Sequence, residues 1–133
     1  MLNLLSMVEI SDENFEKLIN ESMDELPQEY IRGMKNVAVT IADEPSAEQR
    51  HKQQLRDYQT LYGLYEGIPL TKRGSGYNLV LPDKITIFKG PISRGSADII
   101  ALKQQVKHTL WHEIAHHFGL DHDRIHYIED NWN

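Results

Sequence analysis

The feature that most constrains this chain is a long helical pattern in its last third, which stops at a glycine. From Ala97 to Phe118 apolar residues recur at steps of three or four, the spacing that one face of an α-helix presents. Ser96 can cap the start of this helix, and Gly119 stands where a glycine commonly ends one. The sequence therefore predicts one long helix that is followed by a sharp turn.

The end of this predicted helix is rich in histidine. The segment HEIAHHFGLDH, residues 112–122, holds four of the seven histidines in the chain. His112 and His116 lie one turn apart and share a face, which points away from the apolar stripe. Two imidazoles at this spacing can bind one metal ion, and Glu113 then lies beside that ion without ligating it. A carboxylate in that place can accept a proton from water.

A third ligand must come from outside this helix face, because a catalytic zinc ion takes three protein ligands and keeps one open position. Gly119 has no Cβ, so it can adopt positive φ and turn the chain. His122 follows three residues later and can return to the ion. We therefore expect His112, His116 and His122 to bind one Zn²⁺ per chain, with Gly119 as the structural turn.

The other histidines fit less specific roles. His108 lies one turn before His112, but as a fourth ligand it would close the open position. His117 faces away from the pair and is expected in packing or on the surface. His126 and Tyr127 lie beyond the ligand turn, where either could donate a hydrogen bond to a developing oxyanion. The alternative to a catalytic site is a closed structural zinc site. Such a site does not explain Glu113, because it needs no base beside the metal.

Composition narrows the classes of function. The chain has 133 residues and no cysteine, which predicts one domain over residues 1–133 and excludes disulfides and thiolate metal ligands. The net charge of −6 argues against a nucleic-acid partner. No segment has the length of a transmembrane helix or the form of a signal peptide, so we expect a cytoplasmic protein without a membrane partner.

Charge is distributed unevenly along the chain. Residues 67–107 carry seven lysines and arginines against two aspartates, a local net charge of 7 − 2 = +5. These residues either belong to solvated loops or form a basic rim that favours acidic substrates. No pattern in the sequence specifies an oligomeric state.

The rest of the chain predicts a helix followed by short strands. Residues 11–26 form an amphipathic pattern that Ser11 can cap, and Pro27 either stops this helix or opens a short second one. Residues 1–10 are expected to form an extension. Strands are predicted at NVAVTIAD, YNLVLP and KITIFKG, with Asp83 at a turn. The remaining segments are TLYGLYEGIPL, expected as a strand or extended turn, EPSAEQRHKQQLRDYQ, expected as a loop or exposed helix, and TKRGSG and PISRGS, expected as loops.

Several stretches resemble one family. In chain order these are MDELPQEY, NVAVTIADEP, LYGLYEGIPLTKRG, LPDKITIFKGPI and HEIAHHFGLDHDRI. Together they resemble the small bacterial zincin-like metallopeptidases of minimal zincin fold, over about Phe15 to Ile125. The histidine motif also resembles that of the metzincins, but every methionine of this chain precedes the motif, so the methionine turn of that class is missing.

The resemblance has structural and chemical implications. It implies a compact α+β domain, in which a small mixed sheet packs on the N-terminal helix and the long active-site helix. It implies that a peptide lies antiparallel along an edge strand, either ITIFKG or LYGLYEG. The third ligand of this family is often acidic, so Asp121 and Asp123 compete with His122, and Asp123 is also a candidate for supporting the ligands.

The predicted function is zinc-dependent hydrolysis of a peptide bond in a peptide or protein substrate. Glu113 would act as the general base. Two alternatives remain: a zinc hydrolase of a non-peptide amide, and a metal-stabilised binding module without turnover. Glu113 argues against the second alternative, since a binding module needs no base beside its metal.

Overall fold

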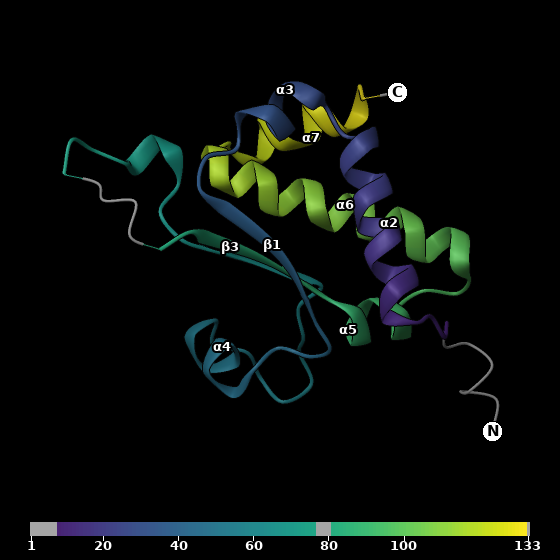
Figure 1. Cartoon of the computed structure of the whole chain (residues 1–133). Helices are drawn as coiled ribbons and strands as arrows, with labels where there is room; N and C mark the ends of the chain where they lie inside the picture. The colour runs from purple at the N-terminus through teal and green to yellow at the C-terminus, as the bar shows by residue number, and fades with distance from the viewer. Residues whose placement is uncertain (1–7, 77–80, 133) are drawn as a thin grey trace.

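The structure is a computed structural model, which describes residues 8–76 and 81–132 (Figure 1). Most of the predicted strand YNLVLP lies outside these described residues. The predicted extension at residues 1–10 does so as well, except for its last three residues. Among these, the backbone N–H of Val8 donates a hydrogen bond of 3.4 Å to the carbonyl of Ser93.

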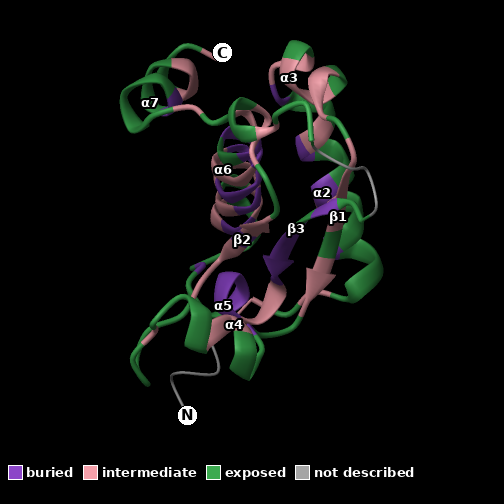
Figure 2. Ribbon diagram, turned by 90° about the vertical axis from the view of Figure 1, so that its left-hand side faces the viewer, coloured by how far each residue is buried: buried purple, intermediate pink, exposed green. Residues whose placement is uncertain are grey.

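A three-stranded mixed sheet forms one layer of the molecule. Its strands are β1 (Val37–Ala42), β2 (Gly63–Glu66) and β3 (Asp83–Phe88), in the spatial order β1-β3-β2. β1 runs parallel to β3, and β2 runs antiparallel to it. Figure 2 shows β3 as the buried strand between two partly exposed ones. β2 is therefore an edge strand of the sheet.

Two helices cover one face of this sheet. α2 (Asp12–Glu25) and α6 (Ile99–Phe118) pack against each other, and α6 also lies on β2 and β3. Ser11 caps α2 as predicted, accepting a hydrogen bond of 3.1 Å from the backbone N–H of Asn14. The predicted α+β architecture, a small mixed sheet packed on these two helices, is confirmed. The buried core is formed by Phe15, Ile19, Leu26, Ile85, Ile87, Ile92, Leu102, Val106, Leu110, Trp111, Ile114, Ala115 and Ile125.

The first residues of α6 differ from the prediction. Asp98, rather than Ser96, caps the helix, and its carboxylate accepts a hydrogen bond of 2.8 Å from the N–H of Ala101. The hydroxyl of Ser96 instead donates to the carbonyl of Ile92 at 2.7 Å. A carboxylate is also favoured at this end of the helix by its dipole, which explains the choice of Asp98.

Two other local predictions are wrong. PISRGS was expected as a loop, but its first residues lie in α5 (Lys89–Arg94). Pro91 sits in the first turn, where its missing N–H has no helical partner to lose, and burial of Ile92 stabilises the short helix. Asp83 lies in β3 and is buried, not at a turn. The remaining short elements are α3 (Gln28–Gly33), α4 (Ala47–Lys52) and the 3₁₀ helix η1 (Leu70–Lys72).

The segment after Gly119 forms a helix that the sequence analysis did not anticipate. α7 (His122–Asp130) begins at the cap residue Asp121 and runs back alongside α6. Its anchor is Ile125, which is fully buried, and whose carbonyl accepts a hydrogen bond of 3.3 Å from the indole N–H of Trp111. One face of α7 is thereby held against the end of α6 that carries the histidine motif.

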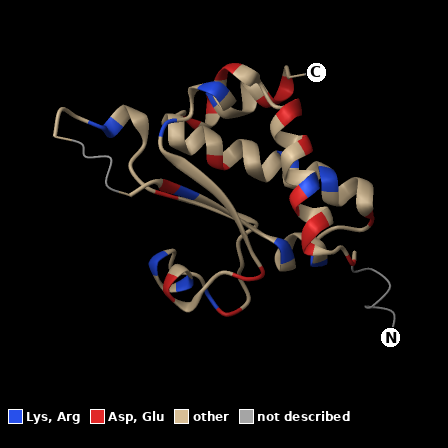
Figure 3. Cartoon of the chain, in the orientation of Figure 1, with Lys and Arg blue, Asp and Glu red and all other residues tan. Residues whose placement is uncertain are grey.

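The cluster of basic residues in the middle of the chain does not form a free basic rim. Figure 3 shows lysines and arginines scattered among carboxylates over several elements. Six of the seven basic residues of this region make ion pairs, which are Arg73–Asp83, Lys84–Glu66, Lys89–Asp12, Arg94–Glu44, Lys103–Glu21 and Lys107–Glu25. The hypothesis of a rim that attracts acidic substrates loses its support.

Candidate metal centre

Six side chains that can bind metal face one another across α6 and α7. On α6 they recur once per turn, because residues four apart share a helix face. Since α7 runs antiparallel to α6, its own face presents a matching series. We define this set as the α6–α7 ligand row, formed by His108, His112 and His116 of α6 and His122, His126 and Glu129 of α7.

The side chains of the ligand row approach one another most closely near the C-terminal end of α7. Glu129 contacts Nδ1 of His108 through one carboxylate oxygen. Its other oxygen lies 3.4 Å from Nε2 of His112. The rings of His108 and His112 are 4.3 Å apart between centroids. Within the described part of the chain, these three residues are the one group of potential ligands whose binding atoms all lie within 4.8 Å of one another.

The predicted ligands occupy the other end and the centre of the row. His116 and His122 are close enough to interact electrostatically. The ring of His126 lies between, 5.9 Å from that of His112 and 6.4 Å from that of His122. The binding atoms of His112, His116 and His122 do not all come within 4.8 Å of one another, so this ligand set stays a prediction.

The protonation of these histidines suits a metal. Burial lowers the pKa of His112, and the neighbouring His108 lowers it further. Burial likewise lowers the pKa of His116, with a further contribution from His122. A lowered pKa leaves more of the imidazole neutral at physiological pH, which is the form that binds metal. The donor set of imidazoles and a carboxylate therefore fits a zinc ion.

Glu113 occupies a cleft between α6 and the edge strand β2. The cleft has a volume of about 360 Å³ and is lined by Tyr62, Gly63, Gln105, His108, Thr109, His112 and Glu113. Burial raises the pKa of Glu113 to about 7, against a smaller opposing effect of the hydrogen bond from the backbone N–H of Tyr65. A carboxyl group with this pKa can both take up and release a proton near neutral pH.

A glycine allows β2 to approach Glu113 closely. A Cβ atom on Gly63 would lie 2.7 Å from Cγ2 of Thr109 and 3.3 Å from Cγ of Glu113. Any side chain there would push the strand away from α6. Gly63 therefore sets the width of the cleft at the position of Glu113.

The turn that joins the two helices is built on Gly119. This residue ends α6 with φ 71° and ψ 27°, in the left-handed region that glycine adopts without strain. Its N–H donates to the carbonyl of His116, and the N–H of Leu120 donates to that of Ala115. These bonds satisfy the end of α6 and direct the chain into α7, so that His122 is the first residue of the new helix.

The remaining candidates occupy different positions on α7. Asp121 caps the helix by accepting a hydrogen bond of 2.8 Å from the N–H of Arg124, which accounts for its presence without a metal. Asp123 is an exposed residue of the first turn. Tyr127 is 61% exposed, with Arg124 over its ring at 5.5 Å. Of the candidate supporting residues Asp123, His126 and Tyr127, His126 is the one that belongs to the ligand row, and its ring lies 5.9 Å from that of His112.

A buried polar network connects the elements that border the cleft with the rest of the domain. His117 is fully buried and its Nε2 accepts a hydrogen bond of 3.2 Å from the backbone N–H of Lys35. Its Nδ1 lies 3.3 Å from the hydroxyl of Tyr65, which donates to Asp83. Asp83 also pairs with Arg73 at 2.5 Å. The network ties β2 and the segment that follows it to β3 and α6.

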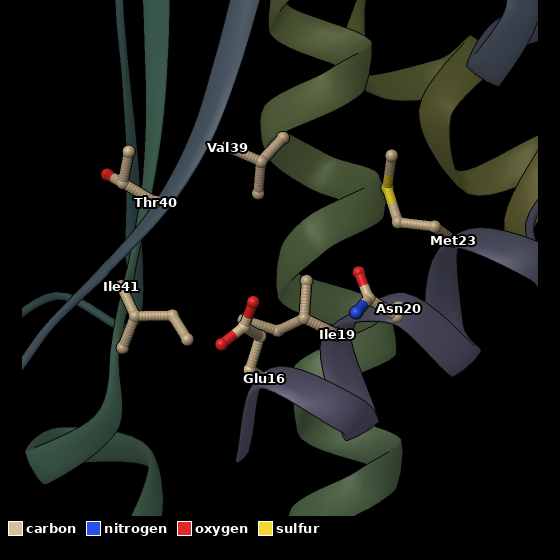
Figure 4. Close-up of a pocket in the computed structure, with 7 residues that line it drawn as sticks. All are labelled: Glu16, Ile19, Asn20, Met23, Val39, Thr40 and Ile41. Atoms are coloured by element: carbon tan, nitrogen blue, oxygen red, sulfur yellow. The ribbon is translucent and has the colours of Figure 1, made fainter. Parts of the chain in front are cut away.

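The structure also has a groove at the opposite edge of the sheet. It lies between α2 and β1 with a volume of about 350 Å³ (Figure 4). Its lining is mostly apolar or amide and hydroxyl side chains, and Glu16 is the one charged residue in it. A single carboxylate does not make a metal site, so this groove is not a candidate metal centre.

Glu129, which lies against His108 and His112 in the structure, was not among the residues predicted for the site, and His108 was considered only as a fourth ligand that would close the open position. The spacing of His108, His112 and His116 is visible in the sequence, since each lies one helical turn from the next. Glu129 could have been found by treating the tail as a helix, because it then shares a face with His122 and His126. The signal for that helix was Asp121, a favoured N-cap residue placed directly after the glycine turn.

Fold and site together define a class of protein. A small mixed sheet packs on a long helix that carries a His-Glu-x-x-His sequence, and an edge strand borders the glutamate, as in a small α+β zincin. The chain belongs to the zincin-like metallopeptidase family, whose sequence model matches residues 34–132. No curated protein matches the chain. Membership in this family supports zinc binding and a metal-dependent protease as the class of function.

None of the described helices has both the length and the apolar character needed to cross a membrane.

Proposed function

We propose that the protein is a zinc-dependent peptidase that hydrolyses peptide bonds in the cleft between α6 and β2. His112, His116 and His122 would hold one zinc ion per chain, and Glu113 would be the catalytic base. The observation that carries the proposal is the placement of Glu113. It lies partly buried in the cleft next to His112, with a pKa raised to about 7, on the helix that the family's sequence model covers.

Zinc held by three protein ligands acts as a Lewis acid and makes a coordinated water more acidic. The chain's own contribution is proton transfer. Glu113 accepts the proton of the attacking water and then delivers it to the nitrogen of the leaving amine. Partial burial of the carboxyl group raises its pKa, and the nearby backbone N–H of Tyr65 lowers it to a smaller extent. His126, close to His112, is the better placed candidate for a hydrogen bond to the oxyanion.

The substrate would bind along β2. Of the two segments proposed for this role, ITIFKG forms the end of β3 and the start of α5, and β3 is paired with a strand on both sides and has no free edge. β2 is an edge strand, and its residue Gly63 lines the cleft. A peptide that adds to this edge would place a backbone carbonyl near Glu113 by β-augmentation.

Two alternatives are kept because the same residues could serve them. A zinc hydrolase of a non-peptide amide would use the same base and ligands, and substrate profiling separates it from a peptidase. A metal-stabilised binding module would need no base, and the raised pKa of Glu113 speaks against it.

The first test concerns the metal ligands. His112→Ala and His116→Ala should each abolish tight zinc binding, measured as zinc per chain after dialysis. His122→Ala should weaken zinc affinity far more than Asp121→Asn or Asp123→Asn. Full zinc retention in both α6 variants would refute the site. A larger loss in Asp123→Asn than in His122→Ala would move the third ligand to a carboxylate.

A further inference from the structure

The α6–α7 ligand row contains more metal-binding side chains than one catalytic zinc ion uses. The proposed function engages His112, His116 and His122. It leaves His108 and Glu129, which meet at the far end of the row, without a role, and it uses the adjacent His126 only as a candidate donor to the oxyanion. Glu129 contacts His108, and its carboxylate lies 4.0 Å from Nδ1 of His126.

The surroundings of Glu129 are unusual for a carboxylate on a helix surface. Only 17% of its side chain is exposed. Its ion-pair partners among the described residues are three imidazoles, those of His108, His112 and His126, and include no lysine or arginine. Elsewhere in the described structure most carboxylates in ion pairs meet a lysine or an arginine. A partly buried carboxylate among imidazoles has the donor composition of a metal site.

We propose that His108 and Glu129 hold a second divalent metal ion, with His126 as third ligand when His112 is engaged by the first ion. With this ion bound, His126 no longer serves as the donor to the oxyanion. The binding atoms of His108 and Glu129 lie within 4.8 Å of each other and of those of His112. His126 is outside this group, and its Nδ1 lies 4.0 Å from the carboxylate of Glu129. Imidazole nitrogen combined with a carboxylate selects zinc and similar transition metals over magnesium or calcium, which prefer all-oxygen sites. The inference rests on the proposed function in one respect, the assignment of His112 to the first ion.

The second ion would lie beside the cleft in which a peptide is proposed to bind. His108 and His112 line the same cleft as Glu113 and Gly63. An ion held by His108 and Glu129 therefore lies at one end of the path that a peptide would follow along β2. It would also fasten the end of α7 to α6, across the two helices that carry all the ligands.

Zinc stoichiometry tests the second position directly. The full chain is dialysed against a series of buffered zinc concentrations, and zinc per chain is measured by elemental analysis. The wild-type protein should saturate at two ions, the second weaker than the first. Glu129→Gln should saturate at one ion with the affinity of the first unchanged. His116→Ala should lose the tighter ion and keep the weaker one.

Cobalt(II) titration gives an independent readout, since its visible absorption reports each ligand environment. Two spectral phases are expected for the wild type and one for Glu129→Gln. Asp130→Asn, a change at the neighbouring exposed carboxylate of α7, should keep both phases and both zinc ions. If Glu129→Gln fails to fold by circular dichroism, His108→Asn takes its place.

Each remaining outcome overturns the inference in a distinguishable way. Saturation of the wild type at one ion, with Glu129→Gln unaffected, means that Glu129 only pairs with His108. Saturation at one ion that Glu129→Gln weakens means that Glu129 serves the first ion. In both cases loss of that ion in His116→Ala leaves the proposed function standing. If the single ion depends on His108 and Glu129 but survives in His116→Ala and His122→Ala, the proposed function falls as well.

Discussion

Glu113 lies where the long helix and the edge strand meet, and its environment is the opposite of that of Glu44. Burial raises its pKa to about 7, whereas the pKa of Glu44 is lowered by the hydrogen bond from Arg94. A carboxyl group held without a cationic partner costs stability. Such a partly buried carboxyl group with a raised pKa is typical of sites where its proton chemistry is used.

The substitution Glu113→Gln should separate chemistry from stability. Glutamine preserves size and can still hydrogen bond, but it cannot take a proton from water. We expect zinc content and melting temperature near those of the wild type, because no ligand is changed. Turnover on any cleaved peptide should fall by about 10²–10⁴-fold, the usual contribution of a positioned acid–base group.

The measurement is kcat on a zinc-loaded preparation against a broad peptide library, with stability followed on the same sample. Glu48→Gln, a change at an exposed glutamate of α4, is the control and should leave all three quantities unchanged. A Glu113→Gln protein that is destabilised but retains full activity per molecule would show that Glu113 is structural.

For single residues, helical spacing predicts which side chains share a face of one helix. It does not predict which residues of two different helices come into contact. His112, Glu113 and His116 follow from one repeating pattern, and Gly119 follows from its lack of a Cβ. Glu129 lies 17 residues beyond His112 in the chain, and nothing local indicates that the two meet. Contacts between α6 and the end of the chain bring them together, among them those of Trp111 with Ile125 and Trp132.

Among the elements, the long strands and helices were predictable and the short ones were not. α2, β1, β3 and α6 each carry a repeating apolar pattern long enough to fix their type. α5 and α7 are short, and they are helical because a few residues become buried. Ile92 in α5 and Ile125 in α7 are both almost inaccessible, and that burial depends on neighbours distant in sequence. β2 was predicted only as a strand or turn, because four residues carry little periodicity.

The close contact between β2 and α6 gives a prediction about the width of the cleft. Gly63→Ala places a methyl group 2.7 Å from Cγ2 of Thr109 and 3.3 Å from Cγ of Glu113. We expect a loss of about 1–3 kcal/mol in the free energy of unfolding, as for other overpacked sites. Activity should fall as well, because the strand moves away from Glu113.

Thr109→Ser supplies the matched background. It removes the methyl group but keeps the hydroxyl that accepts a hydrogen bond of 2.9 Å from Gln105. In this background Gly63→Ala should cost at least about 0.5 kcal/mol less, the coupling expected of residues in direct contact. Chemical unfolding of the four proteins measures this coupling. Equal costs in the two backgrounds would mean that the methyl contact does not set the spacing of β2 and α6.

For the molecule as a whole, the buried network around Asp83 joins the segments that enclose the site. Arg73 follows η1, Asp83 begins β3, Tyr65 lies in β2, and His117 lies in α6. The side chains of Arg73 and Asp83 are 8% and 5% exposed. The hydrophobic core alone would allow these segments to slide, whereas a charged pair with directional hydrogen bonds holds one arrangement. The network therefore adds to the hydrophobic core in fixing the relative positions of these segments.

Loss of Asp83 should therefore destabilise the whole domain. Asp83→Asn removes the charge that compensates buried Arg73, and breaking a buried pair in this way costs about 3–5 kcal/mol. Glu44→Gln is the matched control, since it breaks the Arg94–Glu44 pair, whose side chains are both 50% exposed. That change should cost no more than about 1 kcal/mol. Urea unfolding at neutral pH measures both, and similar costs would show that burial gives the Asp83 pair no special weight.

The Arg73–Asp83 pair also predicts how the difference in the free energy of unfolding between the wild type and Asp83→Asn depends on pH. Although burial alone would raise it, the pKa of Asp83 is lowered below its ordinary value of 3.8, because the carboxylate accepts hydrogen bonds from Tyr65, Arg73 and the N–H of Ile68. The carboxyl group of Asp83 therefore binds a proton more readily in the unfolded chain than in the folded one. The stability that its charge supplies is complete at a pH above the ordinary pKa, and it is lost as the pH falls through the lower pKa of the folded chain. Asp83→Asn has no such proton to bind. Urea unfolding of both proteins at a series of pH values from about 6 down to about 3 should show a constant gap in the free energy of unfolding at the upper end and a narrowing gap below about pH 4. A gap that stays constant over the whole range would show that the charge of Asp83 does not stabilise the fold, and that only its shape is needed in the network.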